Sequence, residues 1–96
     1  EGDEIAKALG NKKVAILQNH GILTTGPSVD IALWFYMSME RCCQAQLMAE
    51  SAGKPISVPH ETAVKTREFI ANDVAAWASY QPAFDKIIKM QPDLLD

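Results

Sequence analysis

The chain has 96 residues, of which 48% are hydrophobic and 22% are charged, and its formal net charge is −3. These values are typical of one globular domain, or part of one, and they give no reason to expect nucleic acid as a partner because no Lys/Arg cluster lies on one predicted face. The longest apolar-rich stretch, Ile31–Met39, is too short to cross a bilayer, and the acidic opening Glu1-Gly2-Asp3-Glu4 does not have the basic start of a secretion signal.

The first quarter of the chain predicts a short helix followed by two strands. Apolar residues at helical spacing favour a helix over Asp3–Leu9, which Gly10 would end. The continuous apolar run Val14–Leu17 predicts a strand covered on both faces, and Ile22–Thr25 predicts a second strand. Because only Gln18–Gly21 separates the two runs, we expect the strands to lie side by side.

A histidine occupies the turn between these strands, in the run Asn19-His20-Gly21. Gly21 can adopt a positive φ and Asn19 favours turns, so the imidazole would stand at the end of a rigid strand, as a metal site requires. A single imidazole cannot hold zinc, which takes three or four ligands, and a lone histidine is more often a hydrogen-bonded turn residue. The other histidine, His60, has no paired spacing with His20 and is expected to be an exposed residue near a helix start.

The main helix is predicted from Ser28, a good N-cap, to Ser51 or Ala52, where Gly53 would end it. Its first half is apolar on nearly every side, so we expect it to be buried on several sides. Two short strands cannot provide that cover, which therefore has to come from an upstream sheet, a neighbouring subunit, or both.

The two cysteines, Cys42 and Cys43, are neighbours on this helix. Neighbouring helical side chains point about 100° apart, so the pair cannot share one tetrahedral metal site without distortion. We interpret both as small buried helix residues in a reducing compartment, and a regulatory or metal role is the alternative.

The remainder of the chain is predicted to be helical after a loop over Lys54–Pro59. The expected helices span Pro59–Ala71, Val74–Tyr80 and Ala83–Met90. Asn72 or Asp73 would end the first of them or cap the second, and Pro82 would stand at the first position of the last. The tail Gln91–Asp96 has no clear element.

Several of these features, taken in order, resemble the class II aldolase/adducin family over residues 10–53. They are the apolar strand, the Asn19-His20-Gly21 turn, a second strand ending at Gly26, the Val29-Asp30 helix opening, and the run from Glu40 to Gln46. The tail also resembles that of family members, notably in Gln81–Asp85 and Gln91–Asp96. The resemblance implies an α/β (α+β) fold, as a helix-rich fragment with two short strands from a three-layer α/β/α domain built around an antiparallel-rich sheet. Residues 1–96 would be the C-terminal part of a single domain whose upstream metal-site portion is absent, and residues 54–96 would be its helical tail.

In that family a catalytic zinc is held by three histidines, and His20 matches the third. The other two come from a His-x-His segment that this sequence does not contain, and the phosphate-binding loops and proton-shuttling glutamate also lie upstream. Asn19 and Gly21 would shape the turn, and Asn19 would brace the imidazole as a second-shell group. The resemblance implies a cytoplasmic, zinc-dependent lyase, or an epimerase or dehydratase, acting on a small sugar or hydroxy-acid. It also implies a homo-oligomer, commonly a tetramer, and a fragment that is not active alone.

Two alternatives remain open at this point. The adducin branch of the same family keeps the fold and a similar Asn-His-Gly stretch without the metal ligands, and it serves as a cytoskeletal assembly module. Without the resemblance, the chain reads as a small helical interaction module that buries its Trp34/Phe35/Tyr36 helix against a partner and folds by itself.

Overall fold

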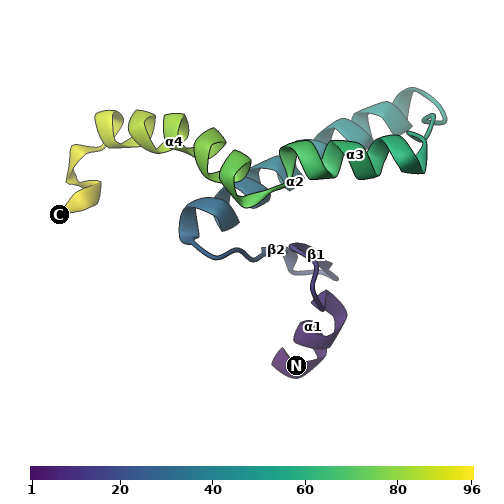
Figure 1. Cartoon of the computed structure of the whole chain (residues 1–96), viewed down its shortest axis with the longest axis horizontal. Helices are drawn as coiled ribbons and strands as arrows, with labels where there is room; N and C mark the ends of the chain where they lie inside the picture. The colour runs from purple at the N-terminus through teal and green to yellow at the C-terminus, as the bar shows by residue number, and fades with distance from the viewer.

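The computed structural model describes residues 1–96, in which a short helix and a strand pair are followed by three longer helices (Figure 1). The elements are α1 (Gly2–Leu9), β1 (Val14–Leu17), β2 (Gly21–Thr24), α2 (Val29–Ala52), α3 (His60–Ile70), α4 (Asp73–Met90) and the short 3-10 helix η1 (Pro92–Leu95). The predicted α/β fragment, helix-rich with two short strands, is confirmed. None of the helices combines the length and hydrophobicity that crossing a bilayer requires.

The two strands form an antiparallel hairpin whose register runs from Val14 opposite Thr24 to Leu17 opposite Gly21. The Thr24 hydroxyl donates a hydrogen bond to the Ala32 carbonyl (2.8 Å) and so ties β2 to the first turn of α2. Gly26 lies in the segment that connects β2 to α2. A Cβ added to Gly26 would lie 3.0 Å from both the Ala32 nitrogen and Ile31 Cγ2. Glycine is therefore the residue that lets the chain turn this closely from strand to helix.

The long helix α2 begins and ends where its capping signals predict. The Ser28 side chain accepts a hydrogen bond from the Ile31 amide (3.3 Å), which satisfies one of the free N–H groups of the first turn. The helix then continues without interruption for 24 residues to Ala52, and Gly53 follows it. The loop predicted over residues 54–59 is also present.

The core lies where α4 crosses the first half of α2. Ile31 and Phe35 of α2 are each 7% exposed, and Ala76 of α4 is fully buried against them. Beside this contact, the Gln81 side-chain amide donates to Asp30 Oδ2 (2.9 Å) and links the two helices through polar groups. These contacts place α4 on the side of α2 that also faces the hairpin.

Asn72 forms the junction between α3 and α4. The sequence offered Asn72 or Asp73 as the capping residue, and the structure confirms Asn72. Asn72 Nδ2 donates to the carbonyls of Glu68 (3.2 Å) and Phe69 (3.0 Å), while Asn72 Oδ1 accepts from the Ala75 amide (2.9 Å). The same side chain thus closes the last turn of α3 and caps the first turn of α4.

The prediction of two separate helices on either side of Pro82 is wrong. A single helix, α4, runs through this proline. Proline inside a helix removes a hydrogen bond and costs about 3 kcal/mol, but its fixed φ is compatible with the helix. Tyr80 and Phe84 pack together across it, with ring centroids 6.2 Å apart, a contact that helical spacing alone brings about. The tail also has a defined element, η1, that its sequence did not predict.

Three predictions of burial are not met within residues 1–96. Ile16 of β1 is 65% exposed, so the strand is not covered on both faces, and Leu33 and Tyr36 of α2 are exposed. Cys42 is exposed and Cys43 is half-buried, so the expectation that both are buried is wrong for Cys42. The physical reason is that β2 and α4 cover α2 on one side and near its first half only.

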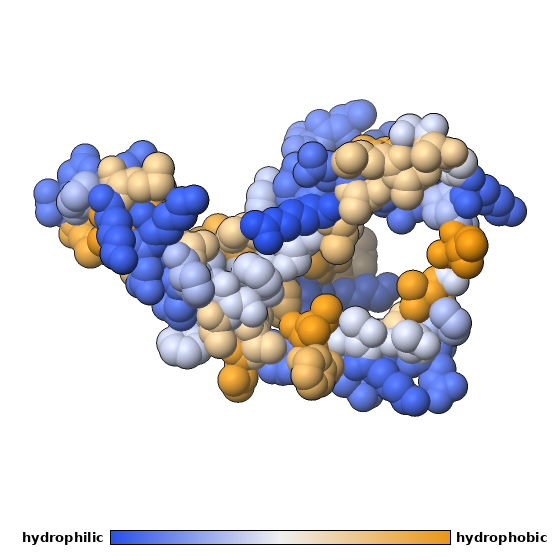
Figure 2. Space-filling model, turned by 90° about the horizontal axis from the view of Figure 1, so that it is seen from above, coloured by the Kyte–Doolittle hydropathy of each residue, from blue (hydrophilic) through white to orange (hydrophobic).

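The chain has an open shape. Its radius of gyration is 15.8 Å, whereas a compact chain of this length is expected to have about 12.5 Å. The second half of α2 and the whole of α3 project from the body as two arms that make no close backbone contact, and Figure 2 shows an opening between them. At the tip of these arms, in the connecting loop, Ile56 and Val58 are exposed.

This shape leads us to expect that the isolated 96-residue chain self-associates or is partly molten. Only three residues are buried, and large apolar side chains are exposed on every element except α1 and β2, a pattern that exceeds what a stable monomer normally shows. Sedimentation, dye binding and near-UV circular dichroism would measure this. A monomeric chain that melts sharply and cooperatively would contradict the prediction and favour the self-folding interaction module.

Candidate metal-ligand turn

The turn that carries His20 is held by backbone hydrogen bonding. The His20 amide donates to the Leu17 carbonyl (3.1 Å), and this bond closes a four-residue turn between β1 and β2. Asn19, at the third position of the turn, has φ 61°, which asparagine tolerates better than most residues. Gly21 follows with φ 129°, a conformation that side chains beyond glycine rarely adopt.

The imidazole of His20 is exposed at this turn and makes no hydrogen bond within the chain. The Asn19 side chain also makes none, so the two groups are not joined in this structure and the turn is shaped by the Asn19 backbone. His60 is the first residue of α3 and is exposed, as expected, and it shares no pocket with His20.

A shallow depression of about 320 Å³ lies beside His20, between α1 and the hairpin. Apolar side chains of Ile5, Ile16 and Leu17 line it together with the carboxylate-bearing residues Glu1 and Glu4. Sequence reasoning missed these two acids, because only the packing of α1 on β1 brings them to the same depression as His20. No group of three or more His, Cys, Asp or Glu side chains in the chain is arranged to hold a metal ion. The chain therefore offers one imidazole ligand and not a complete site.

Comparison with known proteins places this turn in a family. The family model described as Class II Aldolase and Adducin N-terminal domain matches residues 1–47, a range that includes the hairpin, His20 and most of α2. The chain belongs to the class II aldolase and adducin family. Residues 48–96 lie beyond the family model.

Individual relatives include the tail as well. The chain is 38% identical to the decarboxylase NovR of Streptomyces niveus over 94 residues, 98% of this chain and 35% of that protein. It is 36% identical to the 4-hydroxy-3-prenylphenylpyruvate oxygenase/4-hydroxy-3-prenylbenzoate synthase of Streptomyces roseochromogenus subsp. oscitans, again over 98% of this chain and 34% of the relative. The chain thus spans about a third of the length of these proteins.

A solved structure shows the same arrangement of elements. The L-fuculose 1-phosphate aldolase from Glaciozyma antarctica PI12 superimposes with a TM-score of 0.92 at 36% identity, over 97% of this chain and 37% of that chain. The class II aldolase fold therefore accounts for nearly all of the elements described above, including the projecting arms and α4.

The turn geometry predicts different effects on stability for two substitutions of Asn19 in the full-length protein. Asn19→Ala keeps a Cβ at positive φ without a polar side chain and should destabilise by about 1 kcal/mol. Asn19→Gly removes that conflict and should leave stability nearly unchanged. Denaturant midpoints would measure both. Equal midpoints for the two variants would show that the positive φ at position 19 does not affect the stability of the protein.

Proposed function

We propose that the full-length protein is a divalent-metal-dependent enzyme, with zinc as the first candidate, and that His20 supplies one of the metal ligands. The reaction we propose is aldolase-like carbon–carbon bond cleavage, or the related epimerase or dehydratase chemistry. The observation that carries the proposal is the free, exposed imidazole at a hydrogen-bonded turn, inside the part of the chain that the class II aldolase family model matches.

The residues of this chain can fill one ligand position of the proposed metal site, through His20. A neutral imidazole is a good zinc ligand, and both ring nitrogens of His20 are free of hydrogen bonds within the chain, so one can bind the metal while the other finds a partner. The Asn19 amide is also free and is proposed as that bracing partner, while the Asn19 and Gly21 backbone aims the ring. The other ligands and the catalytic base would come from outside residues 1–96. A bound divalent metal would supply Lewis-acid polarisation of substrate oxygens.

The proposed substrate is a small molecule with two neighbouring oxygens beside the bond that breaks. By their names, one relative acts on a sugar phosphate, another is a decarboxylase, and a third oxidises a phenylpyruvate. A hydroxy-ketone sugar, a hydroxy-acid and a 2-oxo acid share this pair of oxygens. We therefore propose a carbohydrate-like or hydroxy-acid substrate first, and include 2-oxo acids because the Streptomyces relatives are as similar to this chain as the aldolase.

A non-catalytic, adducin-like assembly module is the second candidate. The family includes adducin, and no complete metal cluster is formed by the residues of this chain. For either function we propose a homo-oligomer, because the exposed apolar residues Leu33 and Tyr36 of α2 leave a face that further protein can cover. The cytoplasmic location that we propose rests on the family resemblance alone.

Metal content separates the two candidates, with the second histidine as a matched control. We expect the full-length protein to hold about one zinc per subunit, since three protein ligands and an open position suit a catalytic site. His20→Ala should lose most of the metal and most of the activity while the fold is kept, because the side chain is exposed and unbonded. His60→Ala should keep both. Elemental analysis after gentle purification measures the metal.

Full metal content and full activity in His20→Ala would show that His20 is not a ligand. Absence of metal from the unmodified protein, even after zinc is supplied, would favour the adducin-like module and direct the search to protein partners. With metal present, L-fuculose 1-phosphate and 4-hydroxy-3-prenylphenylpyruvate, which appear in the names of two similar proteins, are the first substrates to compare.

A further inference from the structure

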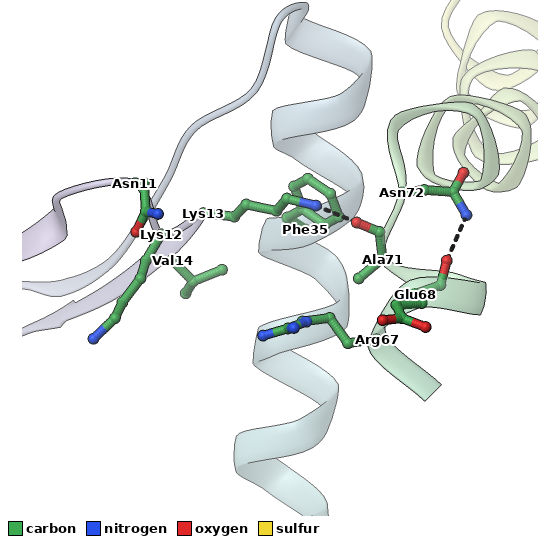
Figure 3. A pocket seen from close by; sticks show the side chains of 9 residues that line it. All are labelled: Asn11, Lys12, Lys13, Val14, Phe35, Arg67, Glu68, Ala71 and Asn72. Atoms are coloured by element: carbon green, nitrogen blue, oxygen red, sulfur yellow. Dashed lines mark hydrogen bonds between the residues drawn. The ribbon is translucent and has the colours of Figure 1, made fainter. Parts of the chain in front are cut away.

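A second concavity, far larger than the depression at His20, lies at the other end of β1. It has a volume of about 760 Å³ and is bounded by the start of β1, the side of α2 and the junction of α3 with α4 (Figure 3). Val14, Phe35 and Ala71 give it an apolar lining, and Phe35 itself belongs to the core. We define this concavity as the Arg67 pocket.

Positive charge is concentrated in the Arg67 pocket although the chain as a whole is negative. Lys12, Lys13 and Arg67, three of the nine basic residues, line it together with a single carboxylate, Glu68. The single ion pair in the chain joins Lys65 to Glu61 elsewhere on α3. The guanidinium of Arg67 and the ammonium of Lys12 therefore have no carboxylate partner within the chain.

Lys13 has a different role from the other two cations. Its ammonium donates a hydrogen bond to the Ala71 carbonyl and lies 5.0 Å from the centroid of the Phe35 ring. These contacts join β1 to the α3–α4 junction and form a wall of the pocket. They leave Arg67 and Lys12 as the cations available to a ligand.

The Arg67 pocket is separate from the proposed metal site. Lys12 and Lys13 come just before β1, whereas His20 comes after it, and the two concavities share no lining residue. The four residues of β1 alone place its two ends roughly 10 Å apart. The elements that form the walls of the pocket have the same arrangement in a much longer solved aldolase chain.

We propose that the Arg67 pocket binds a small organic anion with a flat apolar body, at a site distinct from the metal-ligand turn. The fork of Arg67 matches the geometry of a carboxylate or a phosphate head group, and Lys12 adds a second positive charge. The apolar body rests on Val14 and Ala71, which is the usual division of a ligand pocket into an apolar lining and a few polar anchors.

Two matched pairs of probes test this in the metal-stripped full-length protein. Benzoate and acetate share a carboxylate, and phenyl phosphate and inorganic phosphate share a phosphate, so each pair differs in the apolar body alone. Titration calorimetry or ligand-observed NMR should give a dissociation constant for one aromatic probe in the roughly millimolar range expected of so small a ligand. Acetate or inorganic phosphate should bind about tenfold more weakly. The aromatic probe that binds more tightly identifies the preferred head group.

Because the side chains of Arg67 and Lys12 are exposed, they can be replaced without disturbing the fold. Arg67→Gln and Lys12→Gln should each weaken binding of the aromatic probe about fivefold, since each removes one charge-assisted contact. Lys89→Gln removes the same charge from an exposed position on α4 outside the pocket and should have no effect. His20→Ala should also have no effect, which separates this site from the metal site.

Four results would overturn the proposal, and the first three concern binding of the aromatic probes. These three are the lack of saturable binding of either aromatic probe, equal binding by Arg67→Gln and the unmodified protein, and loss of binding in His20→Ala. Equal affinity for the aromatic and the small probe of each pair would likewise contradict it, because the apolar lining would then make no contribution.

Discussion

The contact of Ala76 with Ile31 and Phe35 is the constraint on which the rest of the structure depends. Because alanine has no side chain beyond Cβ, α4 approaches α2 closely enough to exclude water from both larger residues. The same turns of α2 carry Asp30, which Gln81 reaches, and Ala32, which Thr24 reaches. Strand pair, long helix and last helix are thus assembled around three residues, and the hairpin that presents His20 is fixed to this assembly through β2.

Local chemistry explains which parts of the fold were predictable from the sequence. Ser28, Gly53 and Asn72 act through hydrogen bonds or backbone conformations within a few residues, so the limits of α2 and the α3–α4 junction followed from the sequence. The turn at Asn19 and the exposure of His20 were predictable for the same reason. The continuity of α4 through Pro82 was not, because a proline can stand at the first turn of a helix or inside one, and the neighbouring residues do not distinguish the two cases.

Burial and pocket composition depend on residues that are distant in sequence, and there the predictions were weaker. Ile16 and Cys42 have the residue types of buried positions, yet nothing within residues 1–96 covers them. Glu1 and Glu4 reach the depression at His20 because α1 folds back on β1. Lys13 and Ala71 are 58 residues apart in the sequence and still form one wall of the Arg67 pocket. A single sequence has no periodicity that would reveal such pairs.

The double role of Asn72 has a mechanical consequence for the projecting arms. Helix α3 extends away from the rest of the chain, so its direction is set at one end by the α3–α4 junction, through the Asn72 amide and the Lys13–Ala71 hydrogen bond, and at the other by the loop from Gly53 to Pro59. Eleven residues make a rod about 16 Å long. On a rod of that length, a 10° change in pivot angle displaces the far tip by roughly 3 Å, about twice the rise of one helical residue. A change of angle at the Asn72 junction would therefore cause its largest displacement at Ile56 and Val58, the apolar residues at the tip of the arms.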